Sequence, residues 1–233
     1  MLNIYIGWDQ REAIAWNVLA HSIITRTSEP VNLVPLRQET LRQCGMYWRE
    51  KDALASTDFS LTRFLVPYLS NYEGYSLFLD CDMLCQADIH ELFTIGYRDP
   101  SKSVWVVQHD YTPKATTKMD GQTQTTYPRK NWSSVMLFNN AACRSLTPQA
   151  VRHAAPSELH QLQWTPFESI GQLSTEWNWL IGEYRYNPSA KLAHYTLGGP
   201  WFKTVPVDTH GEQWVKEYYA MTDRYPHFLQ MST

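Results

Sequence analysis

The stretch YSLFLDCDMLCQADIHELF, residues 75–93, decides the fold and raises the question of function. It opens with an apolar run typical of a buried strand, continues through two aspartates, Asp80 and Asp82, and ends in ADIHELF (87–93), which has the pattern of a helix. In an open sheet of mostly parallel strands, ligands bind beyond the carboxyl ends of the strands. The position of the two carboxylates therefore predicts a functional site at that edge of the sheet.

Elsewhere in the chain, strand patterns alternate with helical patterns. Strands are expected at 2–8, 31–36, 75–80, 103–110, 133–139 and 191–195, and helices at 10–25, 56–69 (bent near Pro67), 87–93 and 147–154. This alternation predicts an α/β fold, in which a Rossmann-like, mostly parallel central sheet is flanked by helices. No linker interrupts the 233 residues, so we expect a single domain.

The composition argues against several classes of protein. The formal net charge is −3 with both signs interspersed, so no nucleic-acid partner is expected. The first residues lack a signal-peptide pattern and no apolar stretch approaches the roughly 20 residues of a transmembrane segment, so we expect a cytoplasmic protein. The four cysteines fit neither a disulfide framework nor a zinc site and are expected to be reduced. The 10 tryptophans and 14 tyrosines exceed what a core needs, and such rings often stack on sugars or bases.

Asp80 and Asp82 are candidate metal ligands. Side chains two residues apart on an extended segment point to the same side, so both carboxylates can face one cation. Oxygen ligands of this kind favour Mg²⁺ or Mn²⁺, and the usual partner of such a cation is a diphosphate. The alternative is that the two acids cap the next helix and meet solvent. The Asp-x-Asp pattern by itself leaves both interpretations open.

Five stretches, in order along the chain, resemble the GT-A glycosyltransferases, most closely those of family 8, which includes glycogenin and bacterial galactosyltransferases. LFLDCDMLCQADIHELF (77–93) resembles the Asp-x-Asp segment, and IYIGWD (4–9) resembles the first strand, which holds the nucleotide base. The other three are STDFSLTRFLVPYLSNYEGY (56–75), similar to the helix before the metal strand; NWSSVMLFNN (131–140), similar to a strand with donor-binding Asn residues; and HYTLGGPW (194–201), similar to the late His motif.

This resemblance implies one GT-A domain over residues 1–233, with a nucleotide-binding half at about 1–100 and an acceptor-side half at about 101–233. It implies that Asp80, Asp82 and His194 bind Mn²⁺ or Mg²⁺. The residues implied to bind the sugar-nucleotide donor are Gly7, Trp8, Asp9, Arg63, Asn131, Gly198, Gly199 and Lys203, with Asn139 at the reacting sugar. Structural roles stay open for several of them: a strand end and helix cap for 7–9, a surface salt bridge for Arg63, and a tight turn for the two late glycines.

The chain departs from the family in two places. Family members have a Lys directly before Pro-Trp, whereas Gly199 stands there in this chain and the preceding interval is one residue shorter, so Lys203 is the candidate phosphate ligand. The family's Asp-Gln-Asp segment is replaced by LSTEWNWL (173–180), in which Glu176 is the one carboxylate. We predict that Glu176 is a catalytic-site contact to the donor sugar or the acceptor. An exposed acid at a helix start is the alternative.

The activity implied by the resemblance is transfer of a sugar from a nucleotide-diphosphate sugar, expected to be UDP-linked, to a hydroxyl of a carbohydrate or glycolipid acceptor. Retention at the anomeric carbon and a place in polysaccharide biosynthesis are also implied. A nucleotidyltransferase of sugar nucleotides stays open, although the first strand lacks a Gly-rich basic signature, as does a non-catalytic carbohydrate-binding relative. A phosphohydrolase is disfavoured because Leu84 stands where that class has a Thr.

Two further segments have an expected role. The stretch 111–132 is polar and without periodicity, which is typical of a functional loop, and we expect it to close over the donor as an acceptor lid. Its expected polar residues, with those flanking it, are His109, Asp110, Lys114, Lys118, Asp120, Gln122, Arg129 and Lys130. The segment 212–230 has aromatic residues at helical spacing; we expect it to pack on the domain, with a dimer surface or peripheral membrane contact as alternatives.

Overall fold

The computed structural model describes residues 1–50, 57–111, 117–118, 122–123, 128–203, 205 and 209–222. Its centre is a six-stranded sheet in the order β2-β1-β3-β8-β5-β9. These strands are β1 (Leu2–Gly7), β2 (Val31–Leu36), β3 (Tyr75–Leu79), β5 (Val104–Val106), β8 (Val135–Asn139) and β9 (Ile170–Gln172). Five of the six run in one direction and β8 runs in the other. The expected α/β fold with a mostly parallel sheet is confirmed.

The antiparallel direction of β8 decides what lies at each edge of the sheet. Its first residue pairs with Leu79 at the end of β3, and its last residue, Asn139, pairs with Tyr75 at the start of β3. The backbone N–H of Asp80, directly after β3, donates to the carbonyl oxygen of Ser134, directly before β8, over 3.0 Å. The turn before β8 therefore lies beside the two aspartates, and Asn139 lies at the opposite end of the strand.

A second sheet of three short strands follows the aspartates. It has the order β10-β11-β4 and consists of β4 (Met83–Cys85), β10 (Trp179–Leu180) and β11 (Leu192–His194). The helix expected at 87–93 is α4 (His90–Arg98), and β4, which was not predicted, lies between it and Asp82. Strands of two or three residues are too short to give a periodic pattern, which is why the sequence showed only β11. A hairpin of β6 (Thr117–Lys118) and β7 (Gln122–Thr123) is separate from both sheets.

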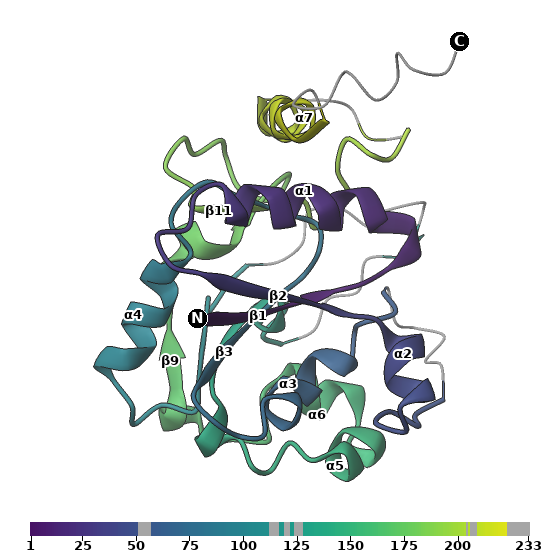
Figure 1. The fold of residues 1–233 in the computed structure, drawn as a ribbon, viewed down its shortest axis with the longest axis vertical. Helices are drawn as coiled ribbons and strands as arrows, with labels where there is room; N and C mark the ends of the chain where they lie inside the picture. The colour runs from purple at the N-terminus through teal and green to yellow at the C-terminus, as the bar shows by residue number, and fades with distance from the viewer. Residues whose placement is uncertain are drawn as a thin grey trace.

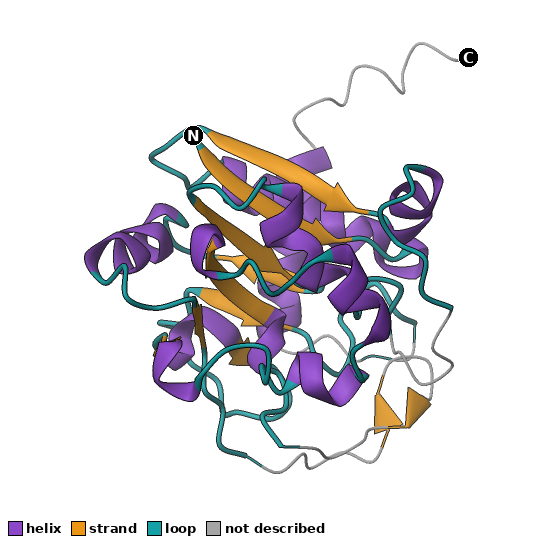
Figure 2. Ribbon diagram, turned by 90° about the horizontal axis from the view of Figure 1, so that it is seen from below, coloured by secondary structure: helices purple, strands orange, loops and turns teal. Residues whose placement is uncertain are grey.

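Helices cover both faces of the central sheet (Figures 1 and 2). On one face lies α1 (Ala13–Ile24), and α7 (Thr209–Thr222) packs on its outer side; α3 (Val66–Leu69), α5 (Pro148–His153) and α6 (Pro156–His160) lie on the other face, with α2 (Gln38–Gln43) nearby. Short 3₁₀ helices span Gln10–Glu12, Thr62–Leu65, Trp132–Ser134, Asn140–Ala142, Phe167–Ser169 and Thr175–Asn178. Among the described residues, no helix has both the length and the apolar character needed to cross a bilayer.

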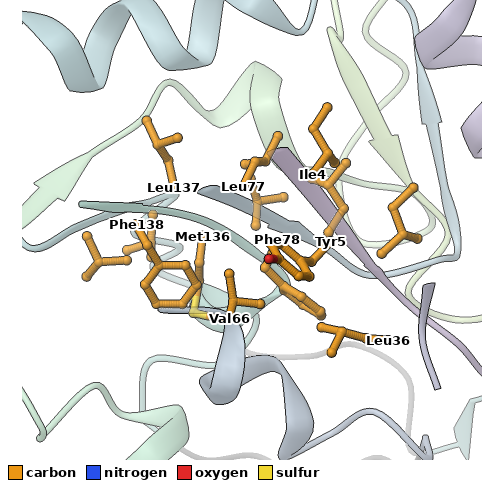
Figure 3. Close-up of a cluster of buried hydrophobic side chains, with 14 of the residues drawn as sticks. Ile4, Tyr5, Leu36, Val66, Leu77, Phe78, Met136, Leu137 and Phe138 are labelled. Carbon is orange, nitrogen blue, oxygen red and sulfur yellow. The ribbon is translucent and has the colours of Figure 1, made fainter. Parts of the chain in front are cut away.

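The core follows the two-residue alternation of the strands. Figure 3 shows that neighbouring residues on a strand point to opposite faces of the sheet, and residues paired across strands point to the same face. One face carries Ile4, Leu77 and Leu137, and the other carries Tyr5, Phe78, Met136 and Phe138, with Val66 of α3 packed against it. Both faces are mainly apolar here, as a sheet covered by helices on each side requires.

The segments 56–69 and 212–230 differ from what the sequence predicted or are only partly described. The single bent helix expected over 56–69 is a 3₁₀ helix followed by α3, and Pro67 lies in the first turn of α3, where its missing N–H is not needed. The expected lid residues Lys114 and Asp120 and the terminal part of 212–230 lie outside the described residues. The described part of that terminal segment is α7, which packs on α1 through Trp214 and Val18.

Candidate metal and donor site

The structure brings the three predicted metal ligands together. Asp80 follows β3, Asp82 precedes β4, and His194 ends β11, which pairs antiparallel with β4 so that His194 lies opposite Met83. The Nε2 atom of His194 is 3.4 Å from Oδ1 of Asp82 and 3.9 Å from Oδ2 of Asp80. One ligand atom from each residue lies within 4.8 Å of the others. Two carboxylates and an imidazole in this arrangement match the mixed oxygen and nitrogen set that Mn²⁺ accepts.

The orientation of His194 is fixed by a residue that the sequence analysis did not identify. Nδ1 of His194 lies 2.8 Å from Oδ1 of Asn178, and Nδ2 of Asn178 donates to the carbonyl oxygen of Asn131 over 3.1 Å. Because the amide nitrogen is committed to that carbonyl, the amide oxygen faces the imidazole and Nδ1 carries the proton. The lone pair of Nε2 therefore faces the two carboxylates. Three acceptors directed at one point need a cation or a proton between them, so the residues fit a divalent metal.

Arg63 is a buried cation beside this group and not a surface salt bridge. Its side chain is 6% exposed, and Nη1 lies 2.7 Å from Oδ1 of Asp80 as an ion pair rather than a well-aligned hydrogen bond. Its N–H groups donate to the carbonyl oxygens of Ser60 (from Nε, 2.9 Å) and Ser133 (from Nη1, 2.8 Å), and its guanidinium lies over the ring of Phe78. Burial raises the pKa of Asp80, with Arg63 opposing and Asp82 adding to that shift.

A third carboxyl group lies behind the metal group. Glu12, in the first 3₁₀ helix, is fully buried; the thiol of Cys81 contacts its Oε2 at 3.7 Å, and its Oε1 has no hydrogen-bond partner among the described residues. Burial, and then the neighbouring charge of Asp82, raise the pKa of Glu12 well above its ordinary value. Burial therefore favours the neutral form of Glu12. Apart from its place after β1, no sequence pattern pointed to Glu12.

The turn before β8 supports the site with its backbone. Asn131 has a left-handed backbone with φ of 61°, and its carbonyl oxygen is the one that accepts from Asn178. Its own amide donates to the hydroxyl of Tyr111 over 2.7 Å. The predicted role of Asn131 in binding the donor stays a prediction; its observed role is to orient Asn178. Left-handed residues other than glycine are uncommon and need surrounding contacts to hold them.

Of the three candidate donor-binding residues at the end of β1, Gly7 and Asp9 have structural roles and Trp8 is partly accessible to solvent. A Cβ on Gly7 would lie 2.3 Å from the ring of Phe59, so close packing requires glycine there. Asp9 is buried and accepts from the backbone N–H and guanidinium of Arg11, which makes it the cap of the first 3₁₀ helix. Burial opposes ionisation of Asp9, but the hydrogen bonds from Arg11 outweigh it, so its pKa is lowered. Trp8 is half-buried and remains the accessible member of the three.

A cavity of about 520 Å³ opens beside Trp8, beyond the ends of β1 and β2. Polar groups from both strand ends line it, including Gln10 after β1 and Arg37, Gln38 and Arg42 after β2. Its volume falls in the range of small-molecule sites, about 300–1,000 Å³. The edge of the sheet where the family resemblance implies the nucleotide base thus holds a cavity in this size range.

Local structure explains both glycines of the late turn, Gly198 and Gly199. Gly198 has φ of 103°, and a Cβ on Gly199 would lie 2.1 Å from the ring of Trp201. The left-handed turn accounts for Gly198, and close packing against Trp201 accounts for Gly199. Lys203 is exposed. The predicted contacts of these three residues with a diphosphate stay predictions.

The two predicted catalytic residues have different outcomes. The structure contradicts a role for Asn139 at the reacting sugar: it lies at the far end of β8, and its amide donates to the carbonyl oxygens of Pro100 and Lys102 over 3.1 and 3.2 Å. The expectation failed because the sequence does not show that β8 runs antiparallel. Glu176 is half-buried in the first turn of the 3₁₀ helix that carries Asn178, and its role stays a prediction.

The flank of the expected lid forms an aromatic cluster near His194. Nδ1 of His109 lies 2.8 Å from the hydroxyl oxygen of Tyr184. The ring centroids of His109, Tyr111 and Tyr184 lie within 6.0 Å of one another. Burial is the main cause that lowers the pKa of His109 to about 3, so its imidazole is neutral at physiological pH. Lys130, expected as a polar lid residue, is also buried.

Comparison with known proteins places this site in context. No protein-family model matches the chain. Protein CDI of Arabidopsis thaliana is 45% identical over 221 residues, which cover 92% of this chain and 85% of that protein.

Solved structures share the fold at low sequence identity. The glycosyltransferase GlyE of Streptococcus pneumoniae TIGR4 matches with a TM-score of 0.60 and 14% identity over 99% of this chain. The bifunctional glycosyltransferase WbbM matches with a TM-score of 0.58 and 13% identity over 93% of this chain. This chain spans 64% of GlyE and 49% of WbbM. The galactosyltransferase LgtC, solved with donor and acceptor sugar analogues, matches with a TM-score of 0.54 and 10% identity over 95% of this chain and 96% of LgtC. The fold is thus of the GT-A type, and by its sequence the chain belongs to the family of Protein CDI.

Proposed function

We propose that this protein is a metal-dependent glycosyltransferase of the family 8 type. It transfers a sugar from a nucleotide-diphosphate sugar, with UDP as the expected nucleotide, to a hydroxyl of a carbohydrate or glycolipid acceptor, with retention at the anomeric carbon. The observation that carries the proposal is the convergence of Asp80, Asp82 and His194 at the carboxyl edge of the sheet. The similarity in fold to three glycosyltransferases supports it.

The residues that would hold a divalent cation are the two aspartates and His194, in the tautomer that Asn178 imposes. A cation bound there would neutralise the charge of the departing diphosphate. The protein supports the ligands from behind: Arg63 pairs with Asp80, and the raised pKa of Glu12 disfavours a further negative charge next to Asp82. This arrangement keeps the carboxylates directed at the donor.

The cavity beside Trp8 is the proposed position of the nucleoside. It lies beyond the ends of β1 and β2, on the same edge of the sheet as the aspartates that follow β3. The indole of Trp8 offers a face for the base, and the arginines and glutamines offer hydrogen bonds to its edge and to the ribose. Glu176 is the proposed carboxylate contact to the donor sugar or the acceptor.

The experiment that tests this proposal measures what is released from the donor. Purified protein is incubated with Mn²⁺ and, separately, with UDP-glucose, UDP-galactose, UDP-N-acetylglucosamine and GDP-mannose, with and without a panel of methyl glycosides. Release of a nucleoside diphosphate from at least one donor, lost in Asp82→Asn, is expected. Formation of a nucleoside triphosphate and a sugar 1-phosphate from a donor when pyrophosphate is added would indicate the nucleotidyltransferase alternative. Binding of glycosides with no release from any donor would indicate the non-catalytic alternative.

A further inference from the structure

The short helix α6 ends on a histidine that joins two distant segments of the chain. Nδ1 of His160 lies 2.8 Å from the hydroxyl oxygen of Ser133, and Nε2 lies 3.2 Å from the hydroxyl oxygen of Ser60. The imidazole also meets the ring of Phe64 edge-on, with centroids 5.3 Å apart. Both ring nitrogens are thus used to connect the segment before α3 to the turn before β8.

The same two serines hold Arg63 through their backbones. Nε of Arg63 donates to the carbonyl oxygen of Ser60, and Nη1 donates to the carbonyl oxygen of Ser133. His160 therefore links, through side chains, the two residues whose carbonyl groups fix the guanidinium from opposite sides. A guanidinium held at Nε and Nη1 has little freedom to move relative to Asp80, with which it pairs at 2.7 Å.

The turn held by His160 also supports the other ligands. The carbonyl oxygen of Asn131 orients Asn178 and through it His194, and the carbonyl oxygen of Ser134 accepts from the backbone N–H of Asp80. α6 reaches this turn at a second point, because Arg129, in a left-handed conformation with φ of 58°, donates to the carbonyl oxygen of Gln161. The end of α6 thus contacts the turn on both sides of Asn131.

We propose that His160 is a positioning residue that fixes Arg63, and through Arg63 the carboxylate of Asp80, in the geometry required for metal binding. Its relevance to catalysis rests on the proposed function. His160 acts without touching the cation or the donor. Hydroxyl groups both donate and accept hydrogen bonds, so either tautomer of the imidazole can satisfy the two serines. A Gln side chain, which carries a donor and an acceptor, should therefore substitute in part, whereas Ala should not.

The first test needs no metal. We expect the Nε–H proton of Arg63, observed by ¹H–¹⁵N NMR, to exchange with solvent at least about tenfold faster in His160→Ala than in the unmodified protein, and at an intermediate rate in His160→Gln. The matched control is Glu158→Ala, which removes the hydrogen bond from the backbone N–H of Ala155 at the other end of α6. Equal exchange in all variants would overturn the proposal. An equal increase in Glu158→Ala would also overturn it, because the effect would then belong to the helix and not to the imidazole.

The second test measures Mn²⁺ affinity in the presence of UDP, from the free Mn²⁺ signal in electron paramagnetic resonance. We expect His160→Ala to weaken Mn²⁺ binding about tenfold, as for other residues that orient metal ligands, and Glu158→Ala to leave it unchanged. Faster Arg63 exchange without weaker Mn²⁺ binding would contradict the link to Asp80. If the unmodified protein binds no Mn²⁺, the proposed function fails, and the exchange measurement still decides whether His160 fixes Arg63.

Discussion

The amide oxygen of Asn178 lies 2.8 Å from Nδ1 of His194 and sets which ring nitrogen is free to bind a metal. The amide itself cannot rotate without losing its bond to the carbonyl oxygen of Asn131. His194 is 2% exposed, so no solvent competes for its Nδ1 proton. The structure thus supplies the outer hydrogen bond that metal-binding histidines generally make.

We expect Asn178→Ala to weaken Mn²⁺ binding by about 10- to 100-fold, because the imidazole loses both its orientation and its preferred tautomer. Mn²⁺ titration with UDP present, followed by electron paramagnetic resonance, measures the change. Asn139→Ala is the matched control, since that amide lies at the far end of β8. Equal Mn²⁺ affinities in the two variants would contradict this role of Asn178.

Removal of the buried cation should cost stability rather than only activity. We expect Arg63→Met to lower the free energy of unfolding by about 3–5 kcal/mol, because it leaves Asp80, whose side chain is only 13% exposed, without its cationic partner. Lys191→Met, which breaks the more exposed pair with Glu91, should cost less than about 1 kcal/mol. Urea unfolding of both variants gives the comparison, and costs of similar size would refute the assignment of Arg63 as a buried ion-pair partner.

The glycine at the end of β1 is expected to be required by packing. Gly7→Ala should lower the free energy of unfolding by about 1–3 kcal/mol, since its Cβ would lie 2.3 Å from the ring of Phe59. Combining it with Phe59→Leu should recover part of the cost, because the smaller side chain leaves room for the methyl group. A double-mutant cycle measures this coupling. Strictly additive effects would show that the ring is not the obstacle.

The docking of α7 on α1 should weaken in acid. Nδ1 of His21 and Nη2 of Arg26 each lie 2.6 Å from a carboxylate oxygen of Glu217. Burial opposes ionisation of Glu217, but these two hydrogen bonds outweigh it, and its pKa is lowered from the ordinary 4.5. The ionised form is therefore favoured by folding; its contribution is present above pH 4.5 and is lost as the pH falls through the lowered value.

Unfolding measured between pH 6 and pH 3 should accordingly show a loss of stability below about pH 4.5 that is smaller in Glu217→Gln. Glu212→Gln, on the exposed part of the same helix, should retain the dependence of the unmodified protein. If Glu217→Gln has the same acid sensitivity as the unmodified protein, another group is responsible.

The sequence predicted the longer central strands well because their patterns are local, whereas β5 is shorter than the expected 103–110 and β9 was not predicted. β2 was predicted to the residue, and β1 and β3 to within one or two, since apolar runs bounded by polar turns are read directly from the chain. The meeting of Asp80, Asp82 and His194 followed from resemblance rather than from periodicity. The position of His194 beside the aspartates depends on the register between β11 and β4. Neither three-residue strand has a local sequence pattern that predicts this register.

What the sequence analysis predicted wrongly or missed depends on strand direction and on which side chains are buried together. The direction of β8 determines that Asn131 lies at the site and Asn139 does not, and strand direction has no signature in a single apolar run. Asn178, Glu12 and His160 were missed because their importance lies in partners distant in sequence. In the segment 173–180, the sequence analysis selected the carboxylate of Glu176. The structure shows that the side-chain amide of Asn178 is the group that contacts His194.

The central claim is that Asp80, Asp82 and His194 form a cation site that a nucleotide diphosphate requires. The most direct test is the melting temperature with UDP, with and without Mn²⁺, for the unmodified protein and Asp82→Ala. At a ligand concentration of about 100 times Kd, we predict a rise of roughly 5–10 °C that needs both Mn²⁺ and Asp82. A rise of the same size without metal or in the variant, or no rise with any nucleotide diphosphate tried in place of UDP, would contradict the claim.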